Sequence, residues 1–269
     1  MHTLACPKCH LPLTKVNTSY LCPNKHCYDL SKQSYLNVLL NPDKATNDPG
    51  DSTESLEART KFLSKGYYDS IVQTVVTTLQ KYSTTDSMHI VDIGCGEGYY
   101  MHRIKQALGN THTYYGLDIA KRAIKMATRY TKDVYWLVGN SKNLPLLDHS
   151  IDFALALFTV VNEKELQRII KKDGYIIHIT ANPNHLVEIK KQIYDTIKVK
   201  SDANIRLDFP IIESFDLVQP VSINNHEDAY NLIKMTPHYY HIKKEKRSVL
   251  DTIDHLEVTI DCKVTVYQP

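Results

Sequence analysis

The sequence predicts an α/β fold in which a doubly wound, mostly parallel sheet follows a small cysteine-rich module. Three observations support this prediction. Four of the six cysteines lie within the first 27 residues, short apolar runs alternate with helical patterns between residues 89 and 181, and a glycine-rich turn follows the first of those runs. Such alternation is typical of a parallel sheet with helices on both faces.

Composition limits the class of protein. The chain has 269 residues, 42% of them hydrophobic, which is enough for one large domain and a small appendage. It contains no run of about 18 apolar residues and lacks the N-terminal pattern of a secretory signal, so we expect a cytoplasmic protein with no membrane partner. The formal charge of +2 neither requires nor excludes a nucleic-acid partner.

The clustered cysteines have the spacing of a structural zinc site. Cys6 and Cys9 form Cys-x2-Cys, twelve residues follow, and Cys22 and His26 form Cys-x3-His beyond a hairpin-like stretch from Leu11 to Leu21. In a reducing compartment, such thiols are more often metal ligands than disulfides. Four protein ligands would close a tetrahedral Zn²⁺ site and leave no position open for chemistry.

The fourth ligand has competitors. Cys27 competes with His26 for that position, and His10 is a third candidate; we favour His26. A segment of about 40 residues rarely buries enough apolar surface to fold alone. The zinc therefore has a predicted structural role in residues 1–40.

Residues 41–85 are expected to connect the module to the main domain. Residues 41–50 are polar, with two prolines and a glycine, and are typical of a linker. Asp51 or Ser52 can cap a helix that runs to Gly66, and a second helical pattern covers residues 67–82.

A strand, a glycine turn and a helix form the second informative stretch. The apolar strand Ile90–Ile93 leads directly into Gly94, Gly96 and Gly98, and a helical pattern continues through Leu108. Glycines let the backbone approach a ligand closely, and the helix N-terminus offers unpaired N–H groups.

The details of this turn favour one kind of cofactor. Tyr99 stands where a third glycine would complete G-x-G-x-x-G, so the dinucleotide fingerprint fails. The pattern G-x-G-x-G preceded by Asp92 instead resembles motif I of class I S-adenosylmethionine-dependent methyltransferases, and NAD is disfavoured.

The following elements agree with that resemblance. A strand ends in Asp118, about twenty residues beyond the turn, where an acidic side chain can accept both ribose hydroxyls. A helix over residues 121–130 leads to a strand ending at Gly139, Asn140 and Ser141, the usual neighbourhood of the adenine. Asp152 opens a fourth strand.

The remaining elements are expected in order along the chain. A helix covers residues 163–174, a fifth strand 175–181, and a basic helix 184–200. A poorly patterned segment then precedes residues 258–269, whose alternation suits an antiparallel strand at the edge of the sheet.

Both halves together resemble one family over nearly the whole chain. Besides the cysteine module and "DIGCGEGYY", the sequence has "AR..FL..G.Y" ending at Tyr68, "HL.EIK..IY" beginning at His185, and "MTP" at residues 235–237. These motifs closely resemble bacterial 23S rRNA (guanine-N1-)-methyltransferases of the RlmA (RrmA) type. The resemblance implies a Rossmann-like class I methyltransferase fold and cofactor contacts from Tyr68, Gly94, Gly96, Glu97, Asp118, Asn140 and His185.

The resemblance also implies an organisation and a reaction. Residues 1–40 would recognise 23S rRNA, residues 41–85 would pack on the cofactor site, and residues 86–269 would form the catalytic domain, in a homodimer with a cleft for an rRNA hairpin. A methyl group would pass from S-adenosylmethionine to guanine N1. That position lies on the Watson–Crick edge, so the base must be unpaired or flipped and must lose its N1 proton. The sequence identifies no catalytic base.

The charge distribution is compatible with RNA binding. Residues 1–47 contain five lysines and two aspartates, a net charge of +3, and Tyr20, Tyr28 and Tyr35 are available either for stacking or for the module's core. Lysines at 190–200 and the cluster at 243–247 could extend a basic track or form a solvated surface.

Two departures from the family pattern keep other functions open. Residues 159–162 replace an Ala-Pro-Cys-like turn where the target base would sit, and Lys172-Asp173-Gly174 replaces Pro-Gly-Gly. The alternatives are a methyltransferase for a small molecule or another RNA site, and a non-catalytic zinc- and RNA-binding relative.

Overall fold

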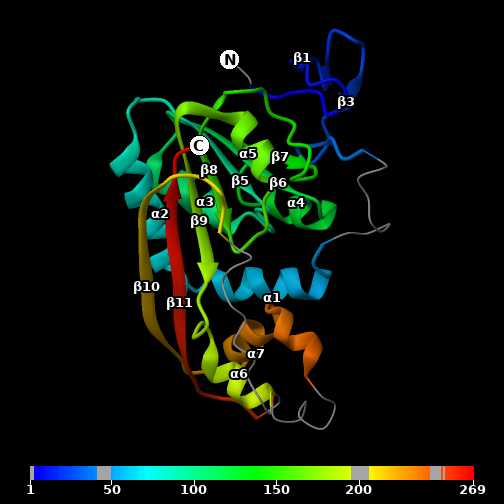
Figure 1. The fold of residues 1–269 in the computed structure, drawn as a ribbon. Coiled ribbons are helices and arrows are strands. Elements are labelled where there is room, and N and C mark those ends of the chain that lie inside the picture. The colour runs from blue at the N-terminus through cyan, green and yellow to red at the C-terminus, as the bar shows by residue number, and fades with distance from the viewer. Residues whose placement is uncertain (1–2, 41–49, 195–205, 243–249, 251) are drawn as a thin grey trace.

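A single eight-stranded sheet forms the centre of the protein (Figure 1). The computed structural model describes residues 3–40, 50–194, 206–242, 250 and 252–269. The strands of this sheet are β4 (Tyr35–Asn37), β5 (His89–Ile93), β6 (Thr113–Asp118), β7 (Tyr135–Val138), β8 (Ile151–Leu157), β9 (Ile170–Ala181), β10 (Ile211–Ile223) and β11 (Leu256–Tyr267).

The strand order is β10-β11-β9-β8-β5-β6-β7-β4. Neighbours from β4 to β9 pair in parallel, whereas β11 is antiparallel to both β9 and β10. This is the doubly wound, mostly parallel sheet that the alternation of strands and helices predicted.

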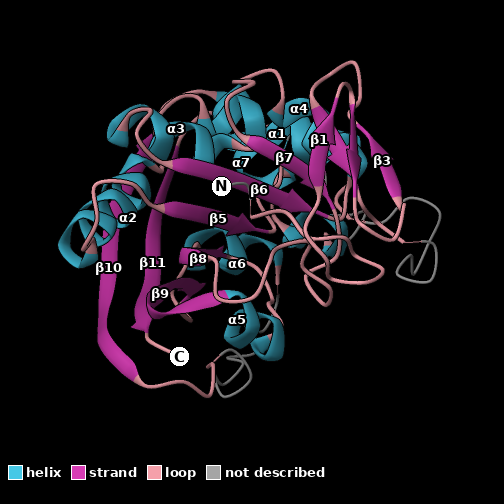
Figure 2. Ribbon diagram, turned by 90° about the horizontal axis from the view of Figure 1, so that it is seen from above, coloured by secondary structure: helices cyan, strands magenta, loops and turns pink. Residues whose placement is uncertain are grey.

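Helices flank this sheet on both faces and at the carboxyl ends of its parallel strands. They are α1 (Thr53–Leu63), α2 (Asp69–Tyr82), α3 (Tyr99–Leu108), α4 (Lys121–Ala127), α5 (Glu163–Ile169), α6 (Val187–Ile193) and α7 (His226–Lys234), followed by the 3-10 helix η3 (Pro237–His241). Helices α2, α3 and α4 pack on one face, around the fully buried Trp136 and Tyr114. The opposite face is covered by α5 and by apolar residues of the N-terminal module, and Figure 2 shows α5 across the sheet from α2 and α3. Among the described residues, none of the helices has the length and apolar character needed to cross a membrane.

The N-terminal module has its own three-stranded antiparallel sheet. Its strands β1 (Thr14–Val16), β2 (Ser19–Leu21) and β3 (Cys27–Asp29) include the expected hairpin. The chain then enters β4, which pairs in parallel with β7, and the Val38 N–H donates to the Val138 carbonyl at 2.9 Å. Because Tyr35 and Leu36 point into opposite faces of the main sheet, the module contributes to both of its cores.

Helix α1 lies across the carboxyl ends of the parallel strands, with α7 and α6 beyond it (Figure 1). Its N-cap is Ser52, one of the two expected capping residues, and the Ser52 hydroxyl accepts a hydrogen bond from the Ser55 N–H at 3.1 Å. An N-cap of this kind satisfies one of the unpaired donors at a helix start. Its buried apolar residues are Leu56, Phe62 and Leu63, which pack α1 against the rest of the domain.

Two expected elements differ from the structure. The helix expected over residues 163–174 ends at Ile169, and β9 begins at Ile170, which pairs with Ile151. Lys171 Nζ lies 2.8 Å from an oxygen of Asp152, so this basic stretch is fixed by a neighbouring strand.

The C-terminal strand lies inside the sheet and not at its edge. β10 comes from the segment that showed little pattern, and it covers β11 by antiparallel pairing along nearly its whole length. The helix expected over residues 184–200 is observed as α6 only, because residues 195–205 lie outside the described chain, as does the basic cluster at 243–247.

Candidate metal centre and active site

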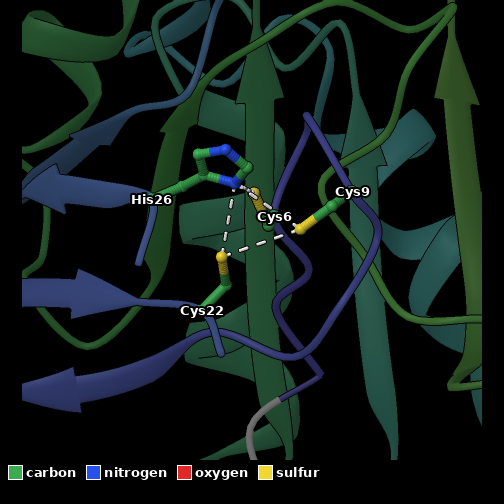
Figure 3. Close-up of side chains that lie close together, drawn as sticks. All are labelled: Cys6, Cys9, Cys22 and His26. Atoms are coloured by element: carbon green, nitrogen blue, oxygen red, sulfur yellow. Dashed lines mark hydrogen bonds between the residues drawn. The ribbon is translucent and has the colours of Figure 1, made fainter. Parts of the chain in front are cut away.

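Three cysteines and a histidine converge at the start of the chain. Figure 3 shows the side chains of Cys6, Cys9, Cys22 and His26 pointing toward one another from two turns of the N-terminal module. Their ligand atoms all lie within 4.8 Å of one another. His26 Nδ1 is 3.4 Å from both Cys6 Sγ and Cys22 Sγ, and Cys9 Sγ is 3.6 Å from Cys22 Sγ.

These separations fit tetrahedral zinc. With Zn–S bonds of about 2.3 Å and Zn–N bonds of about 2.0–2.1 Å, a tetrahedron has S–N edges of about 3.6 Å and S–S edges of about 3.8 Å. Tyr28 Oη lies 3.3 Å from Cys6 Sγ, where it can donate to a thiolate ligand and orient it. The competing candidates Cys27 and His10 are not part of this group of four, and both are exposed. Three thiols and one imidazole make a closed structural zinc centre.

A cavity of about 900 Å³ opens at the carboxyl ends of β5, β6, β7 and β8. It is covered by α1, by the start of α6 and by η3. The structure brings all the residues nominated for cofactor contact into its wall: Tyr68, Gly94, Gly96, Glu97, Asp118, Asn140 and His185.

Asp118 organises the glycine turn at the bottom of this cavity. One of its carboxylate oxygens accepts from the Gly96 N–H at 3.0 Å, and the other accepts from the Ala120 N–H at 2.7 Å. Burial raises the pKa of Asp118, and these two N–H groups oppose the shift. Each carboxylate oxygen can accept a further hydrogen bond. Asp118 can therefore fix the turn and still receive ribose hydroxyls.

Two further carboxyl groups are buried beside the turn without full hydrogen bonding. Within the described part of the chain, Asp92 Oδ2 and Glu97 Oε1 have no hydrogen-bond partner, and the two residues are 1% and 2% exposed. Burial, with the nearby Asp118 and Glu97 charges, raises the pKa of Asp92 to about 8. Burial likewise raises the pKa of Glu97 to about 7, against the opposing effect of Arg59. Orphaned acidic groups of this kind suit a cationic ligand.

Tyr68 and His185 form the wall at the α2 and α6 side. Their rings meet edge to face with centroids 6.3 Å apart. His185 Nδ1 accepts from the Asp261 N–H at 3.2 Å. Burial, and then the charge of Lys190, lowers the pKa of His185 to about 4, so the ring is neutral near neutral pH.

Arg59 lines the cavity although the sequence analysis did not select it. Its guanidinium lies 2.6 Å from Asp51 Oδ2 and donates to the Met235 carbonyl at 3.3 Å. Arg59 is the second residue of the "AR..FL..G.Y" motif, and this position is the sequence signal by which it could have been selected. A guanidinium beside the glycine turn can pair with a ligand carboxylate.

The fold and the cavity define a class I S-adenosylmethionine-dependent methyltransferase. Its side chains match that cofactor, since the buried carboxyl groups of Asp92 and Glu97 can face the sulfonium and ammonium, and Asp118 can accept from the ribose hydroxyls. Residues 90–174 match the family described as a methyltransferase domain, and residues 4–45 match the zinc ribbon described as "RlmA, N-terminal". The chain therefore combines a methyltransferase domain with an N-terminal zinc ribbon of the RlmA type, with S-adenosylmethionine as cofactor and a structural zinc.

Individual relatives support this placement. The chain is 24% identical to the "Putative 23S rRNA (guanine-N(1)-)-methyltransferase YxjB" of Bacillus subtilis, over 97% of this chain and 95% of that one. It is 26% identical to the "23S rRNA (guanine(748)-N(1))-methyltransferase" of Streptomyces fradiae, over 99% and 96% of the two chains. A crystal structure of a "putative methyltransferase" from Bacillus halodurans shares the fold, with a TM-score of 0.50 and 13% identity, over 72% of this chain and 98% of that one.

Proposed function

We propose that this protein transfers a methyl group from S-adenosylmethionine to N1 of a guanine in a 23S rRNA hairpin. The observation that carries the proposal is similarity over 97% and 99% of this chain to relatives named for guanine-N1 methylation. This similarity includes the ribbon as well as the methyltransferase domain. A shared methyltransferase domain alone would be compatible with many substrates.

The residues around the cavity have distinct tasks in this reaction. The cofactor supplies an electrophilic methyl group, so the protein has to align a nucleophile behind it and manage one proton. Asp118 would hold the ribose, Asn140 would contact the adenine, and Asp92 and Glu97 would face the positive charges. Helix α1 covers the cavity and would limit the access of water during transfer.

The ribbon offers a basic surface for RNA. Lys8, Lys15, Lys25 and Lys32 are all exposed. Phosphate contacts of this kind supply sequence-independent affinity that decreases as salt increases. Tyr20 and Tyr35 are buried in the core and therefore unavailable for stacking on bases.

The proposal includes the organisation that the resemblance implies. Residues 1–40 would recognise the RNA, residues 41–85 would support the cofactor site, and residues 86–269 would carry out catalysis. We propose further that the protein acts as a homodimer in the cytoplasm, where 23S rRNA is available.

Reverse transcription of 23S rRNA tests the reaction directly. A methyl group on guanine N1 blocks base pairing and stops the transcriptase at that nucleotide. We expect a stop in cells with the gene that is absent after deletion, and that is restored by the wild-type gene but not by Gly96→Asp. If the two stop patterns are identical, the protein acts on another substrate or has no catalytic role, and a screen with tritiated S-adenosylmethionine would distinguish these outcomes.

A further inference from the structure

An aromatic side chain is exposed at the mouth of the cavity. Phe158 directly follows the last residue of β8, lines the cavity and is 39% exposed. Its φ is +56°, in the left-handed region that bulky residues rarely adopt. The Phe158 N–H donates to the Ile179 carbonyl at 2.9 Å, which holds this conformation. Backbone strain of this kind is concentrated at functional sites.

The inner side of this ring is supported by other rings. The centroids of Phe158 and His185 are 5.7 Å apart, with planes inclined by 35°. His185 is itself fixed by the Asp261 N–H and by the edge of Tyr68. The orientation of Phe158 is therefore set by a packed group on one side, while part of the ring faces solvent.

The strained turn also touches the cofactor loop. A Cβ atom placed on Gly94 would lie 2.4 Å from Thr159 Oγ1, so the residue after Phe158 is in direct contact with the glycine turn. Phe158 thus lies at the mouth of the cavity, next to the glycine turn. Val160, two residues on, is 88% exposed.

We propose that Phe158 is the platform on which the target purine stacks while its edge receives the methyl group. This inference rests on the proposed function, which requires a flipped guanine. Aromatic side chains bind bases through their π faces with little dependence on sequence. Phe158 would therefore contribute RNA affinity and position the base, whereas recognition of guanine would come from groups that contact its edge.

Phe158→Leu tests this role because it keeps an apolar side chain and removes the aromatic plane. We expect KM for an rRNA hairpin to rise about 5- to 150-fold, the range for loss of one stacked base. Phe158→Tyr should stay close to the wild type. Binding of S-adenosylhomocysteine, measured by calorimetry without RNA, should be unchanged in both variants. Phe215→Leu is the matched control, because Phe215 is 36% exposed on β10 and does not line the cavity.

A spectroscopic measurement separates stacking from general disorder of the turn. With 2-aminopurine at the nucleotide identified by the transcriptase stop, we expect fluorescence quenching on binding to the wild type and to Phe158→Tyr, and loss of quenching with Phe158→Leu. Unchanged KM and quenching in Phe158→Leu would overturn the proposal, and so would an equal loss of cofactor affinity. If the wild type methylates no RNA, the proposed function fails and this inference fails with it.

Discussion

The glycine turn allows a sharp test of where the cofactor binds. Gly96 has φ of +57° and Gly109 has φ of +84°, so alanine is strained at both positions. A Cβ atom at Gly96 would face the cavity and lie 3.4 Å from Arg59 Nη1. A Cβ atom at Gly109 would meet no described atom within 4 Å, and this residue lies outside the cavity wall. The two alanine variants therefore separate backbone strain from obstruction of the cavity.

The expected magnitudes differ for stability and for binding. Gly96→Ala should lower the free energy of unfolding by about 1–2 kcal/mol, the cost of a left-handed conformation. Gly109→Ala should lower the free energy of unfolding by about 1–3 kcal/mol, because Gly109 has a ψ of −160° together with its positive φ, a region used almost only by glycine. Only Gly96→Ala should weaken cofactor binding, by about tenfold or more, equivalent to about 1.4 kcal/mol.

Calorimetry with S-adenosylhomocysteine and thermal unfolding of the ligand-free protein measure these two effects. We expect Tm to fall by about 2–4 °C for each kcal/mol in a protein of this size. The reasoning is refuted if Gly96→Ala remains folded and binds within twofold of the wild type. It is also refuted if Gly109→Ala loses as much affinity, because the effect would then come from strain alone.

Three further predictions concern the zinc centre, its link to the main domain and the buried acids. Cys22→Ser should lower the zinc content measured by elemental analysis and lower Tm, whereas Cys27→Ser, at an exposed thiol, should change neither. Asn143 Nδ2 donates to the Pro7 carbonyl at 2.9 Å, so Asn143→Ala should lower the free energy of unfolding by about 1 kcal/mol, the contribution of one hydrogen bond; unchanged stability in urea unfolding would show that this bond does not help to hold the ribbon on the main domain. Burial holds the pKa of Asp92 near 8 and that of Glu97 near 7, above their ordinary values, so the folded state binds protons that the unfolded state has lost. Above about pH 6.5, where histidines with a lowered pKa such as His185 are neutral in both the folded and the unfolded state, the stability of the ligand-free protein should therefore fall as pH rises toward 8, in urea unfolding, and Asp92→Asn should flatten this dependence.

Much of the fold was predictable because local signals agreed with it. The apolar run before Gly94 and the spacing of Cys6, Cys9, Cys22 and His26 each correspond to a structural unit of a few residues. Such units carry their pattern in neighbouring positions, so they can be recognised without knowledge of the tertiary structure.

The elements that were missed depend on distant partners. Ile170–Gly174 has the composition of a helix end, but Gly174 lies against the backbone of the preceding strand, where a Cβ atom would be 2.8 Å from the Asp152 carbonyl oxygen. β10 is largely exposed and contains Pro220, so it lacks the alternation that marks a half-buried strand. Its pairing with β11 stabilises it, and no local pattern reports such pairing.

The residues of the candidate site also fall into two groups, those that local spacing reveals and those that reach the cavity through tertiary packing. Asp118 and the glycines belong to one strand-turn-helix unit and its neighbour, and their spacing reveals them. Tyr68 and His185 came only from the resemblance, and Arg59 was not selected, because these residues reach the cavity from flanking helices. Their orientation is set by packing between segments more than a hundred residues apart, as in the contact of Arg59 with Met235.

The pairing of β4 with β7 has a mechanical consequence for the proposed reaction. The ribbon is attached to the main sheet at Val38, and its first residues also hydrogen-bond to the loop after β7, where the Leu147 N–H donates to the Thr3 carbonyl at 2.8 Å. The ribbon is therefore held against the main domain at two points along its chain, and not by a single flexible connection. If the ribbon binds the rRNA hairpin as proposed, the fold would set the distance between that contact and the cofactor cavity. Lengthening the hairpin by one base pair between the ribbon contact and the target would rotate and displace that guanine beyond the reach of the methyl donor.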